Sequence, residues 1–285
     1  MQKLSLICAL LVVSCVVCAG NVQSRVVETT DLIGSYTHGG RFGGSTITIE
    51  PEGKFHINSS DCTQEYFEAG SYSFKDGVLS LTTTKRTVKS HGESDDQARN
   101  LLAPGVYEKE YRQKLPAGPQ TFELVPVTWG GRVYLIDKTD LHEFPNAINL
   151  GVEPRKTSVS DAYLGSFFLR EGDEKKSGAG RPSLPKDLLA FLLDTPVEAR
   201  IINIEYEGDK QIAVIDRGSD AGLKEGMRFV FVDRQTFWDG PSLWSGLVVL
   251  SVTREMARLK VFENVNIGDK VSSKFVDRRF KDDES

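Results

Sequence analysis

The chain has 285 residues, a formal net charge of −5, and hydrophobic and charged contents of 39% and 26%. This composition is that of an ordinary soluble globular protein, and the length suits two domains better than one. The chain has no stripe of Lys and Arg interleaved with aromatic residues, which together with the mild acidity argues against nucleic acid as a partner.

The N-terminus predicts an export signal. Lys3 precedes an apolar run, Leu4 to Ala19, that is shorter than the roughly 20 residues needed to span a bilayer. Cleavage after this run would release a mature chain that begins at Gly20. This mature sequence contains no second apolar run, so no transmembrane segment is predicted in it. Alternatively, Cys15 follows Val12-Val13-Ser14 in a segment that resembles the bacterial lipobox. The protein is therefore expected to be periplasmic or extracellular, either soluble or anchored as a lipoprotein through Cys15.

The cysteines exclude an intrachain disulfide in the soluble form. Three of the four cysteines lie in the leader, so cleavage after Ala19 leaves Cys62 alone. A lone thiol can be a reactive site, a site of intermolecular pairing or a small buried hydrophobe. Because no His or Lys lies near Cys62 in the sequence to activate it, we favour the unreactive role.

The first domain, over about residues 25–150, is predicted to be β. Apolar residues alternate with period two from Asp31 to about Ile136, which indicates short antiparallel strands. Asp76-Gly77 and Gly130-Gly131 each separate two alternating runs and predict tight hairpins, since such turns require positive φ. With the turn at Pro51-Glu52-Gly53, these signals predict a small barrel or sandwich.

A repeated triplet suggests a family for this domain. Gly34-Ser35-Tyr36 and Gly70-Ser71-Tyr72 are each expected to open a strand. The pattern resembles the strand starts of small lipocalin-like envelope domains, in which Gly-x-Tyr or Gly-x-Trp begins an alternating meander. The resemblance covers residues Asp31 to Leu81 and implies a lipocalin-like barrel.

Residues 151–195 are expected to connect the two domains. Glycine and charge concentrate from Gly172 to Arg181, which predicts the flexible part, whereas the aromatics around Phe167-Phe168 are expected to pack back on the first barrel. Short helices are expected over Asp95–Leu102, Asp140–Asn149 and Pro185–Leu193.

The second domain, over residues 196–276, is again predicted to be β, and residues 277–285 form a charged tail. Its strands are expected at Met227–Val232, Leu247–Val252 and Ala257–Val261.

One turn of this second domain resembles known modules. The segment from Gly218-Ser219 to Gly226-Met227 is similar to a turn in small β-barrel modules of bacterial envelope assembly proteins, such as rod-shape and flagellar assembly factors. This resemblance implies glycines at positive φ and Leu223 as a plug at the barrel end. The Gly-Leu-x-x-Gly part also resembles the turn of PDZ domains, although no Gly-Leu-Gly-Phe type of loop precedes it.

The sequence predicts no catalytic residue, cofactor or metal site. Gly39 to Ser45 is glycine-rich but lacks the Gly-Lys-Ser/Thr ending of a phosphate loop. No Gly-x-Ser-x-Gly elbow selects a serine nucleophile. The chain has four histidines, His38, His56, His91 and His142. None of them has a second His or Cys at metal-ligand spacing.

These observations favour a non-enzymatic, exported cell-envelope protein that acts as a binding or scaffolding module. The wider pattern, Pro126–Leu135 followed by Asn146–Asn149 and Gly165–Arg170, resembles that of secreted bacterial proteins without an assigned activity. Two alternatives remain: a lipocalin-like carrier of a small apolar ligand, and an envelope hydrolase with dispersed active-site residues. Candidate contacts for an envelope partner are Phe237, Trp238 and Trp244, which lie in a turn-rich loop of the second domain.

Overall fold

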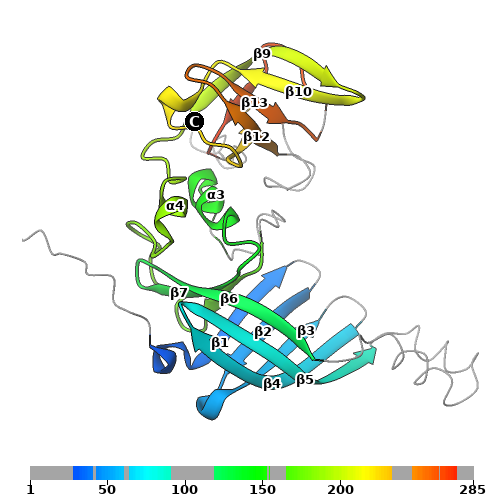
Figure 1. Cartoon of the computed structure of the whole chain (residues 1–285), viewed down its shortest axis with the longest axis vertical. Helices are drawn as coiled ribbons and strands as arrows, with labels where there is room; N and C mark the ends of the chain where they lie inside the picture. The colour runs from blue at the N-terminus through cyan, green and yellow to red at the C-terminus, as the bar shows by residue number, and fades with distance from the viewer. Residues whose placement is uncertain are drawn as a thin grey trace, which may run out of the picture.

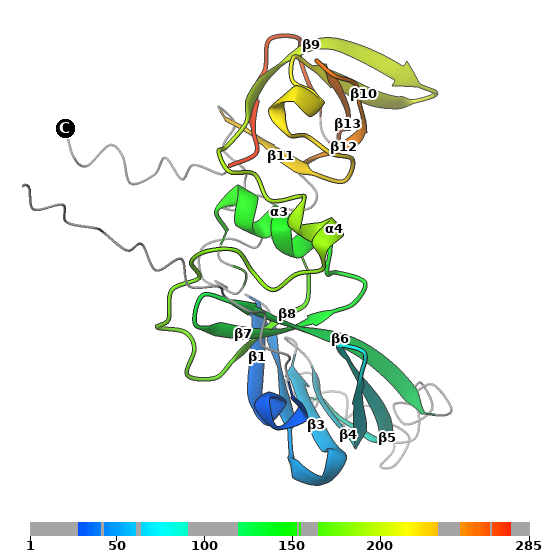
Figure 2. The ribbon, with the colours of Figure 1, turned by 60° about the vertical axis from the view of Figure 1, so that its left-hand side comes forward.

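The computed structural model describes residues 28–40, 43–60, 64–90, 119–152, 154, 165–232, 246–262 and 264–274. It confirms the predicted mainly β class, because the chain forms two closed antiparallel barrels with little helix. One barrel lies on each side of helix α3 (Glu143–Leu150), as Figures 1 and 2 show. The predicted leader, Cys62 and the expected helix Asp95–Leu102 lie outside the described residues.

The first barrel has eight strands, each paired antiparallel with the next. They are β1 (Gly34–Gly40), β2 (Gly43–Ile49), β3 (Lys54–Ser60), β4 (Gln64–Lys75), β5 (Val78–Ser90), β6 (Gln120–Trp129), β7 (Arg132–Asp137) and β8 (Phe167–Arg170). β8 closes the barrel by pairing Arg170 with Tyr36 and Leu169 with Thr37 of β1. This last strand comes from the segment expected to connect the domains, so its aromatics complete the barrel wall.

The hairpin turns form where glycine was expected to supply positive φ. Asp76 and Gly77, with φ of 52° and 78°, join β4 to β5. Gly130, with φ of 61°, joins β6 to β7 through the closing pair Trp129–Arg132. Both hairpins are confirmed, but the second has positive φ at Gly130 alone, whereas positive φ was expected at Gly131 as well.

The second Gly-Ser-Tyr triplet does not open a strand, and this expectation was wrong. Gly70 lies in the middle of β4, directly after a register shift that follows Ala69. A Cβ atom on Gly70 would overlap the carbonyl oxygen of Thr82 on the neighbouring strand. This glycine therefore permits a close approach of two backbones at a bulge, where any side chain would collide.

The barrel interior is apolar and closed at one end. The 3₁₀ turn η1 (Thr29–Leu32) places fully buried Leu32 beneath Tyr36, whose hydroxyl donates to the Leu32 carbonyl at 3.0 Å. Arg170 donates to the same tyrosine oxygen at 2.9 Å. Above this end the buried core consists of Ile47, Ile49, Phe55, Leu79, Leu81, Leu124 and Leu135.

A second apolar cluster lies outside the barrel, between its β6–β8 wall and α3. Phe144 of the helix meets the rings of Tyr134 and Phe167 edge to face, with centroids 5.1 and 5.4 Å apart. α3 begins three residues later than the predicted helix because Asp140 to His142 form turns. Pro145 fits in its first turn, where a missing N–H costs nothing.

The second barrel has six strands in the order β10-β13-β12-β11-β14-β9. They are β9 (Glu198–Glu207), β10 (Lys210–Ile215), β11 (Arg228–Phe231), β12 (Leu247–Val252), β13 (Ala257–Lys260) and β14 (Lys270–Ser272). The three predicted strands are confirmed within one residue at each end.

The turn singled out in this domain has the predicted geometry. It contains the 3₁₀ turn η3 (Ser219–Ala221), followed by Gly222 and Gly226 with φ of 82° and 85°. Leu223 is buried in the core of the barrel, as expected of a plug. Gly218 acts differently, because a side chain there would strike the backbone of residues 253–256.

The segment after β8 packs on the β6–β7 hairpin. Buried Arg132 donates to the carbonyls of Lys176 and Glu174 at 2.5 and 3.1 Å. Trp129 donates from its indole N–H to the Gly180 carbonyl at 3.0 Å. The expected flexible stretch is thus tied to the first barrel.

The short helix after this segment, α4 (Lys186–Leu189), ends earlier than its predicted limit of Leu193. Beyond it, the amides of Phe191 and Leu192 donate three residues back, as in 3₁₀ turns. In the described ranges, no helix has both the length and the apolar character needed to cross a bilayer.

Candidate ligand-binding site

Among the described residues, one end of the first barrel is open because its wall is uneven. β6 pairs with β5 only along Leu79–Thr83, although β5 continues to Ser90. β8 pairs with β1 only at Tyr36 and Thr37, although β1 continues to Gly40. The strands β1 to β5 therefore extend beyond the closed part as an open sheet.

A cavity of about 700 Å³ lies at this open end, and we call it the rim cavity. Three successive rows of paired residues across β1 to β5 line it. The first row is Thr37, Thr46, Asn58, Phe67 and Thr87, the second is His38, Ser45, Ser59 and Tyr66, and the third is Gly39, Gly44, Ser60 and Glu65.

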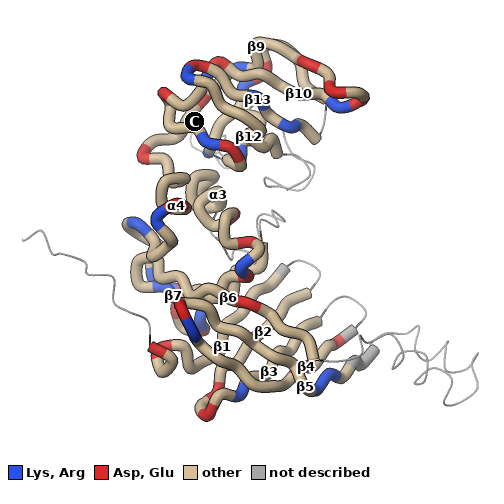
Figure 3. Tube along the Cα trace, viewed as in Figure 1, with Lys and Arg blue, Asp and Glu red and all other residues tan. Residues whose placement is uncertain are grey.

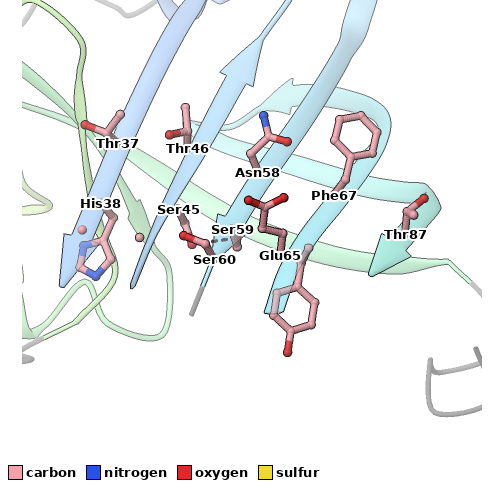
Figure 4. Close-up of a pocket in the computed structure, with 13 residues that line it drawn as sticks. Thr37, His38, Ser45, Thr46, Asn58, Ser59, Ser60, Glu65, Phe67 and Thr87 are labelled. Carbon is pink, nitrogen blue, oxygen red and sulfur yellow. Dashed lines mark hydrogen bonds between the residues drawn. The ribbon is translucent and has the colours of Figure 1, made fainter. Parts of the chain in front are cut away.

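The rows alternate between the two faces of the sheet. The second row shares the face of the buried core residues Tyr36 and Ile47, and the first and third rows share the opposite face. In Figure 4, Thr46 and Phe67 of the first row point to one side of the strands, and His38 of the second row points to the other. The rim cavity is thus lined by residues from both faces of the sheet, at the ends of its strands.

The described lining of the rim cavity is polar and nearly uncharged. Most of its side chains are hydroxyls, and one of them, Ser45, donates to Ser59 at 2.8 Å. β1 and β2 carry no charged residue at all, as Figure 3 shows. Glu65 is the one charged residue among the thirteen described lining residues.

Two aromatic side chains of the lining are held in place by neighbours. Phe67 is 37% exposed and stacks on His56, with ring centroids 6.2 Å apart. The His38 ring lies 5.5 Å from that of Phe168, and its Nδ1 atom is 3.2 Å from the Phe167 carbonyl.

A hydrogen-bonded network lies one row deeper, on the core face. Glu68 and Arg86 form an ion pair at 2.7 Å, with side chains 13% and 18% exposed. Thr83 donates to Glu68 at 2.9 Å, and Arg86 donates to Gln120 at 2.5 Å. These contacts satisfy the buried charges and give the rim cavity a rigid base.

A second polar cluster joins the two barrels through α3. Glu143 accepts two hydrogen bonds from Arg228 of β11, and Asn146 donates to the Gly226 carbonyl at 3.0 Å. Asn149 donates to the Phe191 carbonyl at 2.8 Å. The glycine turn singled out in the sequence is therefore an intramolecular contact, and we regard this junction as structural.

The residues predicted to contact a partner, Phe237, Trp238 and Trp244, lie outside the described residues, as does the lipidation candidate Cys15. Of the histidines, His38 lines the rim cavity and His142 lies at the barrel junction. Within the described ranges, no group of three or more His, Cys, Asp or Glu side chains is placed to hold a metal ion.

Sequence reasoning did not find the rim cavity. Its residues are ordinary Ser, Thr and Asn on alternating strands, and only the strand register brings them together. Comparison with protein-family models, with curated proteins and with solved structures gave no match.

Proposed function

We propose that this chain is a non-enzymatic binding protein that takes a small ligand in the rim cavity of its first barrel. The observation that carries the proposal is the cavity of about 700 Å³, a volume within the usual range of small-molecule sites. The ordered hydroxyls and the base network support binding to a preformed site.

The lining favours a polar ligand over the apolar ligand of a lipocalin-like carrier. The apolar part of the barrel interior is filled by large side chains, including Tyr36, Phe55 and Leu79, which are at most 2% exposed. No Val, Leu, Ile or Met side chain is among the described lining residues.

The same proposal places the protein in the cell envelope. The apolar leader with Lys3 at its start supports export, and the mature chain is soluble or anchored through Cys15. The loop with Trp238 and Trp244 remains our candidate contact for an envelope partner.

A blocked cavity tests the proposal. The mature protein from Gly20 is screened by thermal shift against a library of polar and apolar small molecules. Asn58→Trp introduces a bulky ring at an exposed lining position, and the matched control Asn203→Trp does so on β9 of the second barrel. We expect binding compounds to raise the Tm of the wild type and of the control but not of Asn58→Trp. Equal increases in Tm for all three proteins would show that the compounds do not bind in the rim cavity.

A further inference from the structure

We propose that the ligand of the rim cavity is a short neutral saccharide. This inference rests on the proposed function and names the chemical class of its ligand. It is carried by three features of the described lining residues: their hydroxyl groups, their near absence of charge, and an exposed aromatic ring beside them.

Hydroxyl side chains suit a ligand that is itself rich in hydroxyls. A hydroxyl is both donor and acceptor, and its hydrogen rotates to match a partner. Seven of the thirteen lining residues carry one, and they are Thr37, Ser45, Thr46, Ser59, Ser60, Tyr66 and Thr87. Asn58 adds an amide with two donors and one acceptor on the same row as Thr46. Because the rows alternate between the two faces of the sheet, Thr37, Thr46, Ser60 and Thr87 share one face with Asn58 and Phe67, and Ser45, Ser59 and Tyr66 lie on the other. The face with Phe67 thus offers donors and acceptors at close spacing across neighbouring strands.

The charge of the lining disfavours ionic ligands. An anionic phosphate or sulfate would require Lys, Arg or a cluster of free N–H groups, and none of the described lining residues is Lys or Arg. The single carboxylate, Glu65, is exposed and makes a weak site for a cation. A neutral polar ligand fits these groups best.

Phe67 supplies an apolar ring within the first row, between Asn58 and Thr87. The negative face of an aromatic ring attracts the weakly positive C–H groups of a sugar ring, and burial of both faces adds hydrophobic free energy. Phe67 lies in one row with Asn58 and Thr87 and is held by stacking on His56. A pyranose on Phe67 would place its hydroxyls over these neighbours.

Calorimetric titration of the mature protein tests this inference. The probes are maltotriose, cellotriose and triacetylchitotriose, followed by an array of immobilised neutral glycans. We expect at least one probe to bind, and we expect Phe67→Ala and Asn58→Ala each to weaken that binding about tenfold. The matched controls Tyr206→Ala and Asn203→Ala, both exposed on β9, should leave the Kd unchanged.

The outcomes separate this inference from the proposed function. The inference that the ligand is a saccharide is overturned if no glycan on the array binds, or if both site variants bind as tightly as the wild type. If an apolar or anionic compound from the thermal-shift library binds and Asn58→Trp abolishes that binding, the saccharide is wrong and the binding function stands. If no compound of any class depends on Asn58, both proposals fail. Because Phe67 and Asn58 are exposed, their Ala variants should keep the wild-type Tm, which excludes loss of fold as the cause.

Discussion

Glu143 and Arg228 form a bidentate ion pair that joins the helix on the first barrel to the second barrel. The Arg228 Nε and Nη2 atoms donate to Oε2 and Oε1 of Glu143 at 2.6 and 2.5 Å. The two side chains are 8% and 12% exposed, and Asn146 donates to the same carboxylate at 3.1 Å. Because most of its polar atoms are paired, this buried cluster stabilises the contact between α3 and the second barrel.

Removal of the Glu143 carboxylate should destabilise the protein. Glu143→Ala leaves the buried Arg228 charge without its acceptor, and we expect the free energy of unfolding to fall by about 3 kcal/mol. Urea unfolding followed by circular dichroism measures this change. The matched control Glu123→Ala breaks an exposed pair with Lys138 and should cost less than about 1 kcal/mol. Equal costs for the two variants would show that the junction pair does not stabilise the fold.

Glu143 should also make stability depend on acid pH. Burial raises the pKa of this carboxyl, but hydrogen bonds from Arg228 and His142 outweigh it and lower the pKa from 4.5 to about 2. Its stabilisation is therefore complete above the unfolded pKa of 4.5 and is lost as the pH falls to about 2. We expect Glu143→Gln to flatten this part of the profile of unfolding free energy against pH. A variant as steep as the wild type would assign the dependence to other carboxyls.

His142 should respond in the opposite direction. Its hydrogen bond with Glu143 raises the pKa of the imidazole above 6.5 despite partial burial. The pair therefore stabilises the fold below the unfolded pKa of 6.5, and this contribution is lost as the pH rises through the folded value. An NMR titration of the His142 ring should give a lower pKa in Glu143→Gln than in the wild type. An unchanged value would mean that Glu143 is not its partner.

The sequence predicted those parts of the fold that depend on local chemistry. Asp76-Gly77 and Gly130-Gly131 formed their hairpins because the turn residues themselves allow positive φ, which occurs at Asp76, Gly77 and Gly130. Leu223 was placed correctly because its flanking glycines fix a tight connection. Gly70 was misread because its role depends on Thr82 of another strand, which the triplet does not reveal.

The candidate site escaped prediction because it is made by long-range pairing. Thr46, Asn58 and Phe67 lie in one row only once the registers of β2, β3 and β4 are known. Glu143 and Arg228 likewise meet across 85 residues of sequence. Polar side chains at such positions look like ordinary surface residues until the strands that neighbour them are identified.

Arg132 should protect the segment after β8 from proteolysis. Arg132→Met removes the donors that hold the carbonyls of Glu174 and Lys176, so the exposed bonds after Lys175 and Lys176 become easier to cleave. We expect trypsin to cut there several-fold faster than in the wild type, with fragments identified by mass spectrometry. Arg254→Met, at an exposed position of the second barrel, serves as the control and should leave the rate unchanged. Rapid cleavage of the wild type at the same bonds would show that the segment is already open.

Close packing of the same segment gives a last prediction, at Gly178. A Cβ atom there would lie 2.6 Å from the Cε3 and Cζ3 atoms of the Trp129 ring, which is itself fixed by its bond to Gly180. Gly178→Ala must therefore displace the indole or the segment, and we expect a loss of about 1–3 kcal/mol in unfolding free energy.

Gly131→Ala is the matched control, because its added methyl would meet only the flexible Lys176 side chain at 3.2 Å. Neither Gly178 nor Gly131 has a positive φ, so backbone strain does not separate them. Urea unfolding of both variants should show the larger loss at Gly178. If the two losses are equal, Trp129 is free to move and the segment does not belong to the packed body of the first barrel.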